Sequence, residues 1–190
     1  MRRQRKAWLN KIDGLDPNRL VFLDESGAKT NMTRLYGRAF GGQRVVDAAP
    51  HGHWCTTTMI SSIRLDGTTA AMVIECPTDT AVFRAYVDRV LVPSLRPGDI
   101  VVMDNLAPHK APGVAEAIAS AGAAVWPLPP YSPDFNPIEK MWSKIKAFLR
   151  KTKARTPAAL VEAIGAALQT VTALDATGWF GSCGYRYELA

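Results

Sequence analysis

Two short apolar runs in this chain each stop at a carboxylate. Residues 20–23 (LVFL) precede Asp24, and residues 100–103 (IVVM) precede Asp104. A run of four apolar residues bounded by polar ones is typical of a buried strand. We therefore predict two buried strands whose carboxyl ends present Asp24 and Asp104.

The segment between these runs predicts a hairpin and then a helix. The pair Asp66-Gly67 is a strong signal for a tight turn, so residues 56–64 and 68–75 are predicted to form two antiparallel strands. An apolar face at helical spacing follows, and Pro93 together with Pro97-Gly98 is predicted to end this helix before the Asp104 strand. This face comprises Val82, Phe83, Tyr86, Val87, Val90 and Leu91.

The remaining elements complete an alternating pattern of strands and helices. We predict a helix over residues 112–121 and a short strand over residues 123–128. A helical crossover between the hairpin and the Asp104 strand makes that strand parallel to the Asp24 strand. The predicted fold class is α/β, with a ribonuclease-H-like mixed five-stranded sheet flanked by helices.

An abrupt helix start follows the proline-rich stretch WPLPPYSPDFNP. Asn136 is a favoured N-cap, Pro137 suits the first helical position, and Glu139 stands where a capping-box carboxylate belongs. Capping alone would account for Glu139. An apolar stripe then predicts a helix that docks on the sheet, and a second, alanine-rich helix is predicted over residues 157–171.

Composition limits the class of protein. The chain has 190 residues, 47% of them hydrophobic, which suits one globular domain with its own core. No apolar run approaches the roughly 18 residues of a membrane span, and the basic start lacks the apolar stretch of a signal peptide. We expect a cytoplasmic protein, in the bacterial cytosol, without a membrane partner. The three cysteines are expected to be reduced thiols.

The net charge of +6 is concentrated in two places. One is the N-terminal RRQRK, and the other is residues 140–155, which hold seven cations and no acid. Because Glu to Lys pairing within the helix cannot explain the second cluster, we expect it to contact a polyanionic partner rather than to form an idle solvated face. The residues that would contact such a partner, DNA among the candidates, are Lys140, Lys144, Lys146 and Arg150.

Three carboxylates are the ingredients of a site for hard divalent cations. Asp24 and Asp104 end neighbouring strands, and Glu139 begins a helix that is delivered by a stiff loop. Mg²⁺ prefers carboxylate oxygens, and two ions held close together can clamp both oxygens of a phosphodiester displacement. Asp24, Asp104 and Glu139 are therefore the candidate metal ligands, although a strand-terminal Asp taken singly is often only a turn former.

Polar neighbours supply further candidates around this site. Asn105 and His109 follow Asp104 closely and could orient water or phosphate, or satisfy local backbone groups. Glu25 is expected to point to the opposite face of its strand, outside the metal site. Separately, HGHWC would place His51, His53 and Cys55 on one side of a strand, although no second ligand pair accompanies them.

Three sequence blocks resemble the signatures of DDE transposases, specifically the mariner-like and related bacterial insertion-sequence branch. The blocks are FLDESG, VVMDNLAPHK and LPPYSPDFNPIEKMWSKIK, and 34 residues lie between Asp104 and Glu139. The resemblance spans residues 20–185, including YGRAFGG and GWFGSCGY. It implies that Asp24, Asp104 and Glu139 are the catalytic triad, holding two Mg²⁺ or Mn²⁺ ions.

The resemblance also implies a function. It implies metal-dependent cleavage of DNA at transposon ends and transfer of the 3′-OH into target DNA, at TA, by a homo-oligomer assembled on DNA. Residues 19–190 would form the catalytic domain. Residues 1–18 would be a basic segment or linker remnant, because the helix-turn-helix domains of such transposases are missing. A separate N-terminal DNA-binding half is then a possible partner.

Two other functions fit the sequence less well. A catalytically idle DNA-binding remnant, acting as competitor or partner subunit of an active transposase, would not need all three carboxylates. A metal-dependent phosphatase of similar topology would not need the cationic helix. Metal-dependent nicking of plasmid DNA would distinguish an active transposase from the idle remnant. Activity on small phosphomonoesters would distinguish a phosphatase from a transposase.

Overall fold

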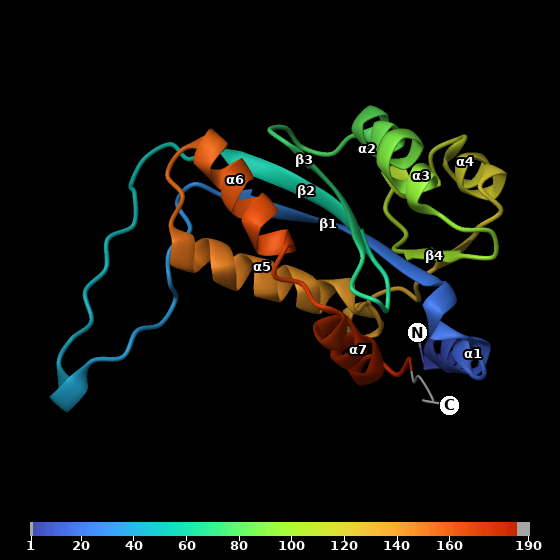
Figure 1. Cartoon of the computed structure of the whole chain (residues 1–190), viewed down its shortest axis with the longest axis horizontal. Coiled ribbons are helices and arrows are strands. Elements are labelled where there is room, and N and C mark those ends of the chain that lie inside the picture. Colours follow the sequence, from blue (N-terminus) through green and yellow to red (C-terminus); the bar gives the residue numbers. More distant parts are fainter. Residues whose placement is uncertain (1, 186–190) are drawn as a thin grey trace.

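A five-stranded mixed sheet forms the centre of the protein (Figure 1). The structure, a computed structural model, describes residues 2–185. The strand order is β3-β2-β1-β4-β5, with β1, β2 and β3 antiparallel and β1, β4 and β5 parallel. The strands are β1 (Leu20–Lys29), β2 (Thr56–Ile63), β3 (Thr69–Ile74), β4 (Ile100–Met103) and β5 (Ala124–Pro127). The predicted α/β class and strand set are confirmed.

Strand β1 is longer than its apolar run predicts. Its parallel pairing with β4 ends at Phe22 and Val102, but its antiparallel pairing with β2 continues to Lys29 opposite Thr56. The hydrogen bonds of β2 keep the polar second half of β1 extended. Asp24 therefore lies within β1, beside the carboxyl end of β4, and the prediction that the strand stops at Asp24 was wrong.

Helices cover both faces of the sheet (Figure 1). One buried core joins the sheet to α5 and its neighbouring helices through residues such as Phe22, Trp142 and Phe180. The other joins the sheet to α2, α3 and α4 through residues such as Val21 and Phe83. The helices are α1 (Arg2–Ile12), α2 (Thr80–Tyr86), α3 (Val92–Ser94), α4 (Val114–Ser120), α5 (Ile138–Thr152), α6 (Pro157–Leu168) and α7 (Ala173–Ser182).

The helical segment after β3 contains a π-helical turn that was not predicted. Phe83, Tyr86, Val87 and Leu91 are buried as the apolar spacing predicts. A π-helical turn, Val87–Leu91, separates α2 from α3, and Pro93 lies in the first turn of α3. Proline is tolerated there because the N–H groups of a first turn need no partner within the helix. The helix ends at Ser94, before Pro97-Gly98 as predicted.

Two helices were not predicted. Residues 1–18 were expected to be a basic segment or linker, but Arg2–Ile12 form α1, whose Trp8 is buried in the core. Helix α7 begins with a capping box between Thr172 and Asp175. No single helix among residues 2–185 is long and apolar enough to cross a membrane, and α6 with α7 meet that test only jointly, across an 80° bend.

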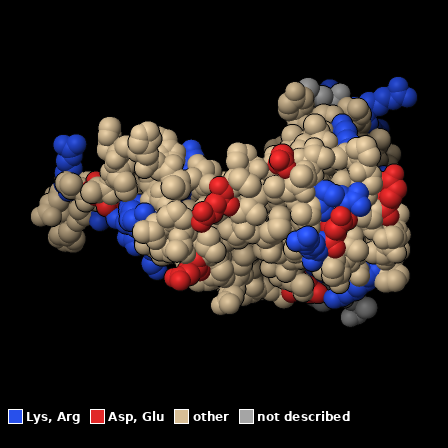
Figure 2. Space-filling view, turned by 90° about the horizontal axis from the view of Figure 1, so that it is seen from above, with Lys and Arg blue, Asp and Glu red and all other residues tan. Residues whose placement is uncertain are grey.

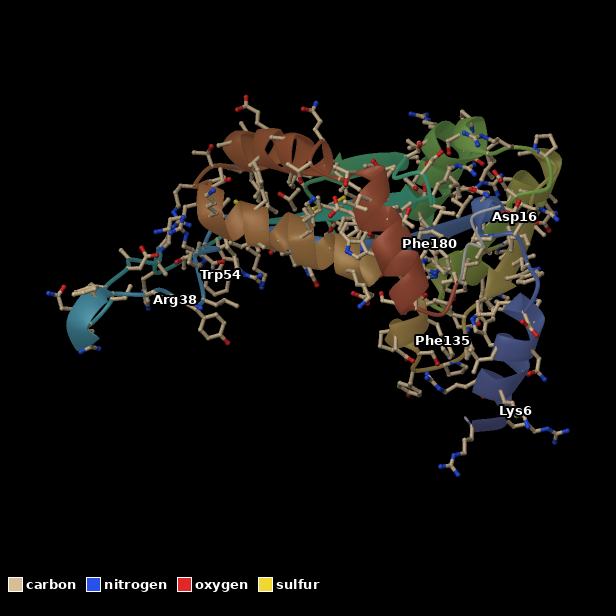
Figure 3. All side chains as sticks on the ribbon, turned by 60° about the horizontal axis from the view of Figure 1, so that its bottom comes forward. Lys6, Asp16, Arg38, Trp54, Phe135 and Phe180 are labelled. Atoms are coloured by element: carbon tan, nitrogen blue, oxygen red, sulfur yellow. The ribbon has the colours of Figure 1, made fainter. Side chains whose placement is uncertain are left out.

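Residues 31–55, here called the arm, project away from the body of the protein (Figure 1). The arm contains one short 3₁₀ turn, Phe40–Gly42, and Figure 3 labels Arg38 and Trp54 on it. His51, His53 and Cys55 lie in this exposed, irregular segment. The strand that would have aligned them does not form, and among residues 2–185 no group of His, Cys, Asp or Glu side chains is arranged as a ready metal site.

Candidate active site

A cleft of about 470 Å³ brings the three predicted carboxylates together. Asp24 comes from β1, Asp104 follows β4, and Glu139 lies in the first turn of α5. Residues 128–137, here called the proline-rich loop, form much of the wall. Parallel pairing of β1 with β4 aligns their carboxyl ends, so residues distant in sequence share this cleft.

Asp24 is the most strongly perturbed of the three. Burial, opposed by a hydrogen bond from the Glu25 backbone N–H and reinforced by the negative charges of Glu139, Glu25 and Asp104, raises the pKa of Asp24 to about 7. The Glu25 N–H donates to Oδ1 of Asp24 at 2.8 Å. A half-buried carboxyl group near other carboxylates lacks a positive charge, which is what a bound cation would supply.

Asp104 is held by two donors on one of its oxygens. The Leu106 N–H donates to Oδ1 at 2.9 Å, and Nδ1 of His109 lies 2.8 Å from the same atom. Burial opposes ionisation of Asp104, but the His109 and Leu106 hydrogen bonds outweigh it and hold the pKa below its usual value. Asp104 is therefore ionised at neutral pH, with its orientation fixed through Oδ1.

His109 connects Asp104 to Glu25. Its Nε2 lies 3.0 and 3.1 Å from the two carboxylate oxygens of Glu25, and its ring packs on Phe83 with centroids 4.3 Å apart. Burial acts to lower the pKa of His109. The hydrogen bonds to Asp104 and Glu25 outweigh burial and raise this pKa to about 10. The imidazolium therefore pairs with both carboxylates at neutral pH, and its single charge offsets one of their two negative charges. The sequence indicated His109 but not its link to Glu25.

Asn105 satisfies a backbone group, one of the two roles considered for it. Its Nδ2 donates to the carbonyl oxygen of Leu128 at 2.8 Å, which ties the segment after β4 to the proline-rich loop. Asn105 also lines the cleft. It is therefore placed to shape the wall beside Asp104.

The side chain of Asn136 does not cap α5, contrary to the sequence prediction. Its Nδ2 lies 3.4 Å from Oδ2 of Asp24, and its buried Oδ1 has no hydrogen-bond partner among the described residues. Helix α5 has Pro137 at its cap and no side-chain cap bond. The nearby carboxyl group of Asp24 draws the amide into the cleft, away from the helix N-terminus.

The carboxylate of Glu139 lies in the cleft without a protein partner among the described residues. Glu139 is exposed, and within residues 2–185 its carboxylate makes no hydrogen bond or ion pair. Its backbone N–H is bonded to the carbonyl oxygen of Asn136 at 3.2 Å, which fixes the start of the helix. The capping interpretation of the Glu139 carboxylate is not supported by these contacts.

The donor set of the cleft fits divalent cations of the Mg²⁺ type. Asp24, Asp104 and Glu139 offer carboxylate oxygens only, the donors that such ions prefer. The raised pKa of Asp24 and the unpartnered buried Oδ1 of Asn136 both mark positions where a cation or its bound water would be stabilising. These residues are the ones that could hold metal.

Helix α5 carries fewer free cations than its sequence suggests. Nζ of Lys144 donates to Oδ2 of Asp175 at 2.6 Å and to the Thr170 carbonyl oxygen at 2.7 Å. The absence of an acid within the basic segment therefore did not mean the absence of a partner, because Asp175 comes from α7. Lys144 therefore links α5 to α7 in this structure, and its predicted contact with DNA stays a prediction.

Lys140, Lys146 and Arg150 form no ion pair among residues 2–185 and remain candidates for DNA contact. Figure 2 views the molecule from above Figure 1 and shows Lys, Arg, Asp and Glu interspersed on that face. That face therefore offers no continuous cationic surface to DNA, and α5 remains the cationic element next to the cleft.

The strand order β3-β2-β1-β4-β5 is that of a ribonuclease-H-like domain, and the cleft beside the sheet contains three carboxylates, as expected for a metal-dependent nuclease. The chain belongs to the DDE superfamily endonucleases, whose family pattern matches residues 19–160. A comparison with curated proteins finds no significant match.

Solved structures with the same fold include Mos1 transposase complexes. The Mos1 transposase paired-end complex with left transposon end superposes with a TM-score of 0.69 at 16% identity, covering 95% of this chain and 57% of that chain. For the Mos1 mariner paired-end complexes with Mg and with Mn, the TM-scores are 0.57 and 0.52 at 19% and 18% identity. These cover 98% of this chain and 63% and 62% of theirs. At such identities the likeness is one of fold.

Proposed function

We propose that this chain is the catalytic domain of a transposase that cleaves DNA at transposon ends and joins the freed 3′-OH to target DNA, at TA. The observation that carries the proposal is the meeting of Asp24, Asp104 and Glu139 in one cleft of a DDE superfamily fold. Residues 19–190 would form this domain, of which residues 186–190 lie outside the described structure. The chain spans about three fifths of the Mos1 chains it resembles.

The three carboxylates would together hold two Mg²⁺ or Mn²⁺ ions. The ions would activate the attacking hydroxyl and neutralise the charge that develops on the phosphodiester. Asp24 would release its proton on binding a cation, because the positive charge would offset the burial and the neighbouring negative charges that raise its pKa. Asp104 would offer the oxygen that His109 and Leu106 leave free, and Glu139 would complete the set from a fixed helix start.

DNA would reach the cleft along α5. Lys140, Lys146 and Arg150 would contact phosphates, and Glu139 precedes them on the same helix. The Mos1 structures are paired-end and transposon-end complexes, with Mg or Mn in two of them, which supports DNA and a divalent cation as partners here.

Further copies of the chain would assemble on the DNA, and a separate N-terminal DNA-binding half would select the ends. The arm supports assembly, because it exposes apolar side chains that a monomer leaves in water, among them Leu35, Tyr36, Phe40 and Val46. Its base is fixed by Arg155, which donates to the carbonyl oxygens of Thr30 and Met32 at 2.9 Å.

Nicking of supercoiled plasmid with Mn²⁺ tests the proposal. We expect nicked and linear products that EDTA abolishes, and no hydrolysis of p-nitrophenyl phosphate. Plasmid binding without cleavage would support the idle remnant instead, and phosphomonoester hydrolysis would support a phosphatase. Either result would overturn the proposed function.

A further inference from the structure

Helix α1 lies outside the family match and yet contacts the proline-rich loop directly. Nη1 of Arg5 donates to Oγ of Ser132 at 2.8 Å and to Oδ1 of Asp134 at 2.9 Å, and Nη2 donates to Oδ2 of Asp134 at 2.6 Å. The guanidinium carbon lies 4.3 Å from the centre of the Phe135 ring. One side chain of α1 thus engages three residues of the loop.

A second set of contacts joins α1 to the same loop from inside the core. Trp8 is 4% exposed, and its Nε1 donates to the hydroxyl of Tyr185 at 3.2 Å. That hydroxyl donates in turn to the carbonyl oxygen of Phe135 at 2.7 Å. The Trp8 ring also packs edge to face with Trp126, at 6.3 Å between centroids. Figure 3 shows Phe135 close to α1, on which Lys6 is labelled.

The contacted part of the loop leads directly to the candidate metal site. Ser132, Asn136 and Glu139 line the cleft, and Phe135 immediately precedes Asn136. Tyr131 has φ 52°, a left-handed conformation that a bulky residue adopts only when its surroundings impose it. The prolines restrict the loop, but external contacts must select this conformation.

We propose that α1 braces the proline-rich loop and that Arg5 is a positioning residue that acts on Glu139 through Ser132, Asp134 and Phe135. The inference rests on the proposed function for its catalytic consequence, but not for the structural link. The side chains of Arg5 and Asp134 are 34% and 56% exposed, so their ion pair adds little to stability. Its two-pronged geometry, with Phe135 beneath, instead fixes the orientation of the loop.

The test compares Arg5→Ala with Lys6→Ala, which removes the same charge from an exposed neighbour on α1. We expect Arg5→Ala to slow Mn²⁺-dependent plasmid nicking about 10-fold, because small displacements of a catalytic group are costly. Arg5→Ala and Lys6→Ala should bind DNA with equal affinity. Lys6→Ala should nick plasmid at the wild-type rate. Arg5→Lys should recover only part of the rate, since an ammonium lacks the fork.

Two further measurements distinguish a change in the position of the loop from a general loss of charge or stability. Hydrogen exchange of the backbone amides of residues 134–140 should accelerate in Arg5→Ala and not in Lys6→Ala. Asp134→Ala should add nothing to Arg5→Ala in the double variant, because both remove one interaction. Equal nicking and equal exchange in Arg5→Ala and Lys6→Ala would overturn the brace. If the wild-type protein does not nick DNA, the proposed function fails, and the exchange comparison alone decides the brace.

Discussion

Asp24 combines partial burial with a proposed role that requires charge, and the two conflict in the metal-free protein. Its pKa of about 7 lies above the 3.8 of an ordinary Asp, so the folded state holds the proton more tightly than the unfolded chain does. As pH rises from about 4 to 7, the unfolded chain ionises first, and the free energy of unfolding falls. A bound cation would reverse this loss by pairing with the carboxylate.

We therefore predict that Asp24→Asn stabilises the metal-free protein at pH 8. In EDTA its thermal midpoint should exceed that of the wild type by about 4 °C or more, and should change less between pH 5 and 8. Calorimetry across that range measures both, with Asp13→Asn, an exposed carboxylate, as the control. A wild-type midpoint that rises with Asp24 ionisation would contradict this assignment.

The link between Glu25, His109 and Asp104 predicts an effect on metal affinity. Glu25→Ala should raise the dissociation constant for Mn²⁺ by about 10- to 100-fold, the usual effect of removing a partner that orients a ligand. Glu25→Gln should have a smaller effect, because the amide oxygen can still accept from Nε2 of His109. Titration calorimetry measures the affinity, with the exposed Glu116→Ala as control. Unchanged Mn²⁺ binding by folded Glu25→Ala would rule out the link.

At the residue scale, the sequence predicted that the three carboxylates lie together, as they do in the cleft, because their types, spacing and strand ends are local features. It did not predict the contact between Glu25 and His109. Strand alternation predicts which face of β1 Glu25 occupies, but not that His109, from a distant segment, forms a hydrogen bond with it. The sequence also assigned Asn136 to the helix cap, because capping preferences ignore a buried carboxyl group nearby.

Helix α5 carries both Glu139 and several cations, and only some of these cations lack an ion-pair partner among the described residues. Lys144 is paired with Asp175, which also accepts from Thr172 in the capping box of α7. The hydrogen bond to Lys144 is the largest cause that lowers the pKa of Asp175 to about 2, which keeps this carboxylate charged. Lys144 thus stabilises the packing of α7 against α5.

The salt dependence of DNA binding should report this difference. Replacing Lys146 or Arg150 with alanine should lower the slope of log affinity against log salt by about 1 each, because each removes one phosphate contact. Lys144→Ala should leave the slope unchanged and reduce thermal stability. Fluorescence anisotropy with labelled duplex DNA measures the slopes. An equal drop for Lys144→Ala would mean that its ion pair opens on DNA.

Elements with a strong periodic pattern were predicted well, and those held by distant contacts were not. The stripe of α5 predicted a docked helix, and Ile138, Met141, Trp142 and Ile145 are buried. Helix α1 was assigned to a linker because it is strongly basic and carries one buried residue, Trp8, whose partners come from β5 and the C-terminal segment.

At the scale of the whole molecule, the sheet brings three segments to one edge and the two cores hold them there. The core around Val21 and Phe83 supports the ring of His109 and hence Asp104. The core around Phe22 and Trp142 supports α5 and hence Glu139. The overall topology followed from the order of strands and helices, whereas the projection of the arm did not, because its residues carry no periodic pattern.

The Mn²⁺-dependent nicking rate of Glu139→Gln tests the central claim most directly, because Gln keeps the size and hydrogen-bonding capacity of Glu and removes only the charge that a divalent ion requires. We predict a rate at least ~100-fold below wild type, with a metal-free thermal midpoint within about 4 °C of it. Glu162→Gln, the same change at an exposed position on α6, should nick normally. Nicking by Glu139→Gln at the wild-type rate would contradict the assignment of Asp24, Asp104 and Glu139 as a metal-binding catalytic triad.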